Sequence, residues 1–186
     1  MHGKSRLAAA ATRRTELARA IALDTIAAAR RVCAVTVVTA DAAVAVAARA
    51  LGATIVDERE PRGLNAAIAA GVEAAHSGHR AAMLGDLPAL RPEELAAALQ
   101  AAAAADRTVV PDAEGSGSTL VTARAGLPWA SAFGADSLAR HVEIGCAVLD
   151  AGPTLRRDVD TVAQLDAAAV LGLGPRTAAV LARTDR

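Results

Sequence analysis

The chain has almost no aromatic residues. Trp129 and Phe133 are the only two among 186 residues, and tyrosine is absent. Proteins that bind RNA or single-stranded DNA commonly stack the bases on aromatic side chains. The 20 lysines and arginines are matched by 20 aspartates and glutamates, so the basic excess typical of nucleic-acid-binding proteins is missing as well. We therefore expect no nucleic-acid partner.

Cysteines and long apolar runs are also scarce. Cys33 and Cys146 are the only cysteines, which are too few for a disulfide framework, and no Cys/His cluster suggests zinc. Each lies in an apolar run, which predicts two buried free thiols in a reducing cytoplasm. No uninterrupted apolar stretch reaches about 18 residues, and Arg13 and Arg14 interrupt the alanine-rich start, so neither a membrane helix nor a signal peptide is expected.

Short β-branched runs alternate with alanine-rich helical segments. We expect strands at 33–39, 53–56, 80–84, 108–110, 119–123 and 147–149. We expect helices over 15–32, 42–51, 64–76 and 136–144, with others beginning at Pro92, Thr161 and Gly174. This alternation predicts one α/β domain over residues 1–186, with a mixed, mostly parallel sheet and helices on both faces. Ligands of such sheets bind beyond the carboxyl ends of the strands, where the candidate polar residues are Asp41, Asp57, Asp86, Asp112, Asp158 and Asp160.

Two acidic segments could hold a divalent cation. Gly85 allows close backbone approach, and Asp86 offers a hard oxygen ligand suited to Mg²⁺. Asp158 and Asp160 would point to the same face if their segment is extended, where their charges repel unless a cation lies between them. The alternatives are a turn or helix cap at Asp86, and a capping Asp160 next to a solvated Asp158. Thr161, with Gln164 three residues later, forms a capping-box pattern.

Two glycine- and serine-rich loops could bind an anion. One spans residues 115–119 and the other residues 133–137, which lead into a helix N-terminus rich in N–H donors. The alternative is that both are ordinary surface loops. His141 lies one helical turn after Ser137 and could border such a site; the other histidines show no ligand spacing.

Basic and amide side chains supply the remaining candidates. Lys4 and Arg6 could neutralise a triphosphate, although a frayed basic terminus is the alternative. Asn65, at a helix start, could read a purine edge through its paired donor and acceptor, or could simply cap the helix.

Taken together, six segments resemble one family. KSRL, PRGLNAAI, LGDLPAL, GSGSTL, FGADSLARH and RDVDT occur in the order seen in the guanylyltransferases of coenzyme F-420 biosynthesis, which use phosphoenolpyruvate or 2-phospho-L-lactate. The resemblance covers essentially the whole chain, and FGADSLARH with RDVDT is its most specific part. It implies a Rossmann-like nucleotidyltransferase fold, related to the nucleotide-diphospho-sugar transferases.

The resemblance also implies roles for individual residues. It implies Mg²⁺ held by Asp86 and Asp158, with Asp160 beside them, and an acid substrate held by Ser118, Gly134 and Ser137. We expect GMP transfer from GTP to the phospho-acid, with release of pyrophosphate. The residues expected on the nucleotide side are Lys4, which would hold the leaving pyrophosphate, Arg6, Asn65 and Gly85.

The expected enzyme is cytoplasmic and has no membrane partner. Its product would pass to the next transferase of the pathway, and a homodimer is left open. The substrate could be phosphoenolpyruvate, 2-phospho-L-lactate or 3-phosphoglycerate, and an actinobacterial composition favours the first. The rival readings are a molybdenum-cofactor or sugar-phosphate nucleotidyltransferase and a non-catalytic nucleotide-fold subunit.

The resemblance has one departure. Family members begin with a strand of the type VIPVK, followed by about half a dozen residues before the Lys-Ser/Thr-Arg-Leu segment, whereas here Lys4 is the fourth residue. We therefore expect a sheet without its first, central strand, in a chain truncated relative to the family by a misplaced start codon.

Overall fold

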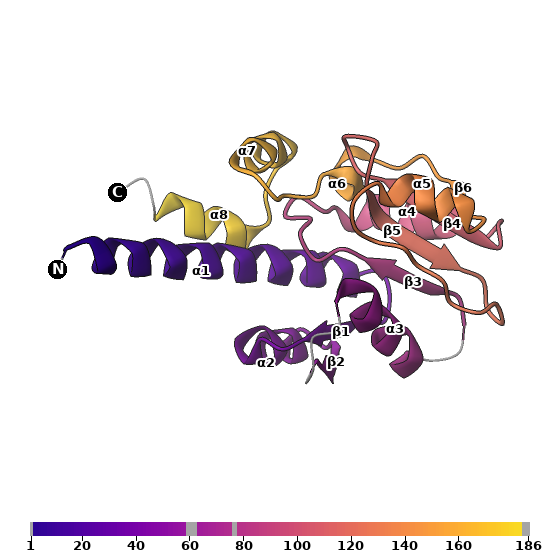
Figure 1. Ribbon diagram of the computed structural model, residues 1–186, viewed down its shortest axis with the longest axis horizontal. Coiled ribbons are helices and arrows are strands. Elements are labelled where there is room, and N and C mark those ends of the chain that lie inside the picture. The colour runs from indigo at the N-terminus through magenta and orange to yellow at the C-terminus, as the bar shows by residue number, and fades with distance from the viewer. Residues whose placement is uncertain (1, 59–62, 76–77, 184–186) are drawn as a thin grey trace.

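Helices and strands alternate along the chain, which confirms the α/β class. The computed structural model describes residues 2–58, 63–75 and 78–183, with side chains from residue 11 onward (Figure 1). The described helices are α1 His2–Arg30, α2 Ala42–Ala50, α3 Leu64–Ala74, α4 Pro92–Ala102, α5 Ser137–Glu143, α6 Pro153–Arg156, α7 Val162–Leu171 and α8 Pro175–Ala182. The described strands are β1 Thr36–Thr39, β2 Thr54–Asp57, β3 Arg80–Met83, β4 Arg107–Pro111, β5 Ser118–Ala123 and β6 Ala147–Val148.

The described strands form two sheets, where a single sheet was expected. β1 and β2 pair in parallel, and the other four strands follow the order β3-β5-β4-β6. β5 is antiparallel to both of its neighbours, whereas β4 and β6 are parallel. β4 and β5 are joined by a short loop, and a short connection forces neighbouring strands to run in opposite directions. The four-stranded sheet is therefore mixed, and only one of its three described strand pairs is parallel, so the expectation of a mostly parallel sheet is wrong for it.

The two sheets meet at α3. This helix contacts β1, β2 and β3, and Val38 of β1 approaches the backbone of Gly71 closely enough that a Cβ there would lie 2.8 Å from its Cγ2. Among the described residues, β1 and β3 each pair with a strand on one side only. β1 and β3 are therefore edge strands of separate sheets that α3 bridges.

Helix α1 supports both sheets. It contacts α2, α4 and α8, and in Figure 1 its N-terminal half extends beyond the sheets with α8 alongside it. Ile26 packs with Val44, Ala48 and Ala53 beside the two-stranded sheet. Ala29 joins the main cluster, which contains Leu87, Leu90, Leu95, Ala98, Val110, Leu120 and Leu155.

Three local expectations need correction. The first helix begins at His2 instead of residue 15, because the alanine-rich start has high helix propensity. Cys33 is exposed, since it follows the end of α1 in a turn, whereas Cys146 is buried as expected. Helix α6 was not expected: Glu94, from α4, accepts hydrogen bonds from the N–H groups at its start, and the local sequence does not show that partner.

The described helices include none that is long and apolar enough to span a membrane. The Thr161–Gln164 capping box is confirmed, since the Thr161 side chain accepts from the Gln164 N–H while the Gln164 side chain accepts from the Thr161 N–H.

Candidate active site

The candidate residues gather at one edge of the four-stranded sheet. Asp86 follows β3, Asp112 follows β4, and Ser118 begins β5. The Leu84 N–H donates to Thr119 O at 2.9 Å, which ties the end of β3 to the start of β5. Because β5 is antiparallel to its neighbours, its start lies beside their carboxyl ends.

The segment that carries Asp86 is fixed on both sides. The Leu87 N–H donates to Thr25 Oγ1 of α1 at 3.2 Å, and Pro88 O accepts from the Gly174 N–H, just before α8, at 2.7 Å. Leu87 itself is completely buried in the main core. Since a Cβ added at Gly85 would meet no protein atom within 4 Å, the glycine leaves open space directly before Asp86.

Asp112 organises the loop between β4 and β5. Its Oδ1 accepts from the Ser116 N–H at 3.0 Å, and its Oδ2 accepts from the Gly117 N–H at 2.8 Å. A Cβ at residue 117 would lie only 2.4 Å from Asp112 Oδ2, so this close approach requires glycine. The loop therefore delivers Ser118 to β5 in a fixed position.

The two loops predicted to bind an anion lie together. The Leu138 N–H donates to Ser116 O at 3.1 Å, and Ser137 Oγ donates to Ser118 Oγ at 3.2 Å. Ser118 and Ser137 are 3% and 2% exposed, so their hydroxyls form a buried pair. The turn before α5 has positive φ at Gly134 (123°) and at Asp136 (50°), and the Asp136 side chain does not cap the helix.

Asn65 supports the second loop from α3. Its Nδ2 donates to Phe133 O at 2.9 Å, and its Oδ1 accepts from the Phe133 N–H at 2.9 Å. Ser131 Oγ also donates to the same Oδ1 at 3.2 Å. The amide is therefore engaged on both its donor and acceptor sides by the loop that holds Gly134, and its reading of guanine stays a prediction.

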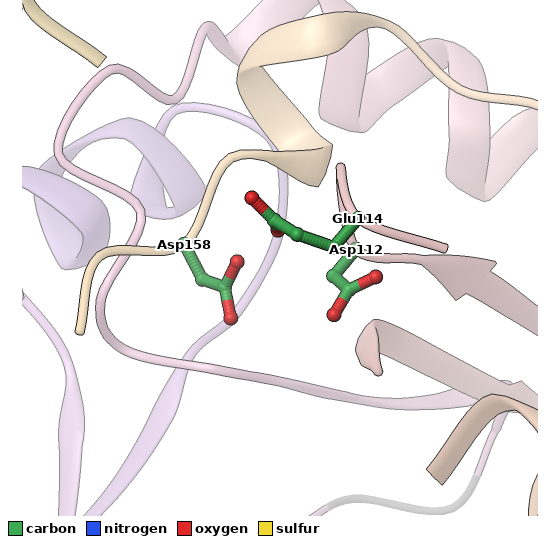
Figure 2. Close-up of side chains that lie close together, drawn as sticks. All are labelled: Asp112, Glu114 and Asp158. Carbon is green, nitrogen blue, oxygen red and sulfur yellow. The ribbon is translucent and has the colours of Figure 1, made fainter. Parts of the chain in front are cut away.

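Three carboxylates converge where α6 leads into the Asp158 segment. Asp112, Glu114 and Asp158 each offer an oxygen within 4.8 Å of those of the other two (Figure 2). Arg157 forms an ion pair with Glu114, and its guanidinium holds the pKa of that carboxyl below its ordinary range. Sequence reasoning missed Glu114, although its position two residues after Asp112 in a post-strand loop was a usable signal.

Within the described part of the chain, Asp86 and Asp158 are the two carboxylates with a buried oxygen that has no hydrogen-bond partner. In both residues this oxygen is Oδ1. Burial, reinforced by the charge of Asp158, raises the pKa of Asp86 to about 6. Burial also raises the pKa of Asp158, and the charges of Asp112 and Glu114 add to that effect. Buried carboxylate oxygens without donors suit a hard divalent cation, so these residues fit the predicted Mg²⁺.

Asp160 differs from Asp158 in its surroundings. It is exposed, whereas Asp158 is only 9% exposed. Its charge nevertheless contributes to raising the pKa of Asp86 and of Asp158. Of the remaining post-strand residues, Asp41 serves as the N-cap of α2, accepting from the Ala43 and Val44 N–H groups.

Lys4 and Arg6 lie on α1, in the part whose side chains are outside the described residues. Thr25, which contacts the Asp86 segment, lies about 20 residues further along the same helix, which is roughly 30 Å at 1.5 Å per residue. The helix therefore does not bring Lys4 and Arg6 to a triphosphate bound beside Asp86.

The amino-acid sequence is similar to one protein family over most of its length. The sequence model of a family described as "Guanylyl transferase CofC like" matches residues 1–148. A phosphoenolpyruvate guanylyltransferase of Thermomonospora curvata is 47% identical over 97% of this chain and 83% of its own length. Proteins with the same name from Geodermatophilus obscurus and Streptomyces coelicolor are 49% and 48% identical; each match covers 91% of this chain, and 80% and 84% of the respective relatives.

Proposed function

Because this chain belongs to the CofC-like guanylyl transferase family, we propose that it transfers GMP from GTP to phosphoenolpyruvate and releases pyrophosphate. Nucleotidyl transfer is the activity of the family. The acid is proposed because the three similar proteins described above carry its name. We place the reaction in the cytoplasm, as a step of coenzyme F-420 biosynthesis whose product is consumed by a further transferase.

The buried hydroxyl pair is the observation that carries this proposal. Ser118 and Ser137 lie 3.2 Å apart at the sheet edge, beside the turn at Gly134. Hydroxyl donors and the N–H groups of a glycine-rich turn suit the carboxylate or phosphate oxygens of a small acid. The connection from β5 to α5 contains two aromatic residues, and both pack against the core: Phe133 is buried in the cluster with Val109 and Val121, and the partly buried Trp129 packs against that cluster. No aromatic platform for a large ring system therefore lies in the loop, which favours a small acid.

We propose that Asp86 and Asp158 hold Mg²⁺, with Asp160 nearby. Their unpartnered oxygens are the observation that supports this assignment. Mg²⁺, when bound, supplies positive charge that lets two polyanionic substrates approach each other. Asp112 accepts hydrogen bonds from N–H groups of its own loop, and Glu114 is paired with Arg157. We therefore propose that these two residues fix the loop and do not ligate the cation.

The reaction needs no covalent intermediate with the protein. An oxygen of the substrate phosphate attacks the α-phosphorus of GTP, a new P–O bond forms, and the bond to the β-phosphate bridging oxygen breaks. Pyrophosphate leaves with that electron pair. The task of the protein is then to align the two substrates and to neutralise charge. We propose a Rossmann-like arrangement in which Gly85 and Asn65 lie toward the nucleotide. Lys4 and Arg6 precede Thr25, which contacts the Asp86 segment, by about 20 residues of one helix, or roughly 30 Å, so we do not assign them to the leaving group.

The proposal is tested by identifying the product. The purified protein is incubated with GTP and Mg²⁺, together with phosphoenolpyruvate, 2-phospho-L-lactate or 3-phosphoglycerate, and the mixture is followed by ³¹P NMR and mass spectrometry. We expect phosphoenolpyruvate to give a guanylylated acid and pyrophosphate in equal amounts, faster than the other two acids do. Release of pyrophosphate with GMP alone, or preference for another acid, would contradict the proposal.

A further inference from the structure

His141 is completely buried on α5, beside the hydroxyl pair. Its Nδ1 lies 3.0 Å from Ser118 Oγ, and its Nε2 lies 2.9 Å from the backbone nitrogen of Ala132. The Phe133 ring packs edge-on against the imidazole, with the ring centroids 4.9 Å apart. The histidine therefore touches both of the loops proposed to hold the acid.

The Ala132 contact fixes the tautomer of the ring. A backbone N–H can only donate, so Nε2 must offer its lone pair, and the proton of the neutral imidazole lies on Nδ1. Nδ1–H then donates to Ser118 Oγ. Burial lowers the pKa of His141, which favours the neutral ring that this arrangement needs.

Two donors therefore converge on the oxygen of Ser118. One is Nδ1–H of His141, and the other is the Ser137 hydroxyl. A hydroxyl oxygen has two acceptor positions and one hydrogen to donate. With both acceptor positions filled, the Ser118 hydrogen must point to an acceptor of its own, and none is found within the described part of the chain.

We propose that His141 is a positioning residue, which turns the Ser118 hydroxyl into an obligate donor to an anionic oxygen of the acid substrate. This inference rests on the proposed function. A serine that is free to rotate presents its lone pairs to an anion part of the time, whereas this one presents only its hydrogen. The hydrogen bond between His141 and Ser118 therefore pre-organises the acid site before the acid binds.

The tautomer can be tested without activity. Long-range ¹⁵N–¹H correlation spectra of the histidine-labelled full chain distinguish an imidazole protonated on Nδ1 from one protonated on Nε2. We expect Nδ1–H for the resonance that disappears in His141→Gln and persists in His79→Gln, a control at an exposed histidine. Protonation on Nε2 at neutral pH would overturn the inference.

Kinetics test the consequence for the acid. His141→Leu should raise the KM for phosphoenolpyruvate by roughly tenfold with little change in the KM for GTP, because one charge-assisted hydrogen bond is weakened. His141→Gln, which keeps one donor and one acceptor, should stay within about threefold of wild type. In a protein that already carries Ser118→Ala, His141→Leu should cause almost no further rise in the KM for phosphoenolpyruvate, because the hydroxyl that His141 orients is absent.

Several results would separate the inference from the proposed function. If His141→Leu and Ser118→Ala raise the KM for the acid independently, the histidine has only a structural role. If His141→Leu does not fold, His141→Gln and the tautomer measurement still decide. If the wild-type protein transfers no GMP to the acid, the proposed function fails, whatever the tautomer.

Discussion

At the scale of single residues, the most informative groups are the buried polar atoms that have no hydrogen-bond partner. A buried polar atom without a partner costs on the order of 1–3 kcal/mol, and Asp86 and Asp158 each contain one. Proteins keep such costs at sites where a ligand removes them. The GDLP and RDVDT segments made both residues candidate cation ligands, with a turn, a helix cap or a solvated carboxylate as alternatives. The family resemblance implied the Mg²⁺ role, which stays a prediction. The partners of Asn65 could not be predicted, because Phe133 is 68 positions away and the contact depends on how α3 meets the loop.

Asp86→Asn should make the cation-free protein more stable. The folded chain keeps the Asp86 proton up to about pH 6, whereas an ordinary aspartate releases it near 3.8. The folded form therefore binds more protons between these values, and the free energy of unfolding falls as the pH rises through this window. At pH 7.5, chemical denaturation should show the variant to be more stable by about 1–3 kcal/mol.

The same variant should lose the response to the cation. Mg²⁺ should raise the melting temperature of the wild-type protein, because a ligand that binds the folded form stabilises it, and should leave Asp86→Asn unchanged. Asp166→Asn, at an exposed position on α7, is the control and should behave like wild type. A less stable Asp86→Asn protein, or one that still responds to Mg²⁺, would refute the cation assignment.

At the scale of helices and strands, local sequence predicted most of the architecture. β-branched runs, Pro92 and the Thr161–Gln164 box predicted their elements to within a few residues. What local sequence could not predict is which strands pair, because pairing joins residues far apart in the chain. The separation into two sheets and the capping of α6 by Glu94 are both such long-range outcomes.

Asp24 makes a testable long-range contact between helices. It is 6% exposed on α1 and accepts from the Thr177 N–H and hydroxyl of α8, each at 2.8 Å. Asp24→Ala should lower the free energy of unfolding in urea by about 3 kcal/mol, because buried donors lose their acceptor. Asp166→Ala, on the exposed surface of α7, should change it by less than about 0.5 kcal/mol. Equal effects of the two variants would show that α8 is not held through Asp24.

At the scale of the whole molecule, distant parts of the chain meet at one sheet edge. Helix α1 and the start of α8 hold the Asp86 segment, α3 holds the loop at Phe133, and α5 brings Ser137 to Ser118. The resulting site brings together the hydroxyl pair proposed to bind the acid and the two carboxylates proposed to hold Mg²⁺. The account therefore predicts that acid binding and GTP binding depend on different residues of the same edge.

The kinetic constants of serine variants test that claim most directly. Ser118→Ala and Ser137→Ala should each raise the KM for phosphoenolpyruvate about tenfold. The first variant loses a hydrogen bond to a charged group, which contributes roughly 1.5–3 kcal/mol, and the second loses the donor that orients the Ser118 hydroxyl. The KM for GTP should stay within about twofold of wild type. Ser116→Ala, at an exposed position in the same loop, should change neither constant. The placement of the acid between these loops would be contradicted if the KM for GTP rises instead. It would also be contradicted if Ser118→Ala and Ser137→Ala leave the KM for phosphoenolpyruvate as unchanged as Ser116→Ala does.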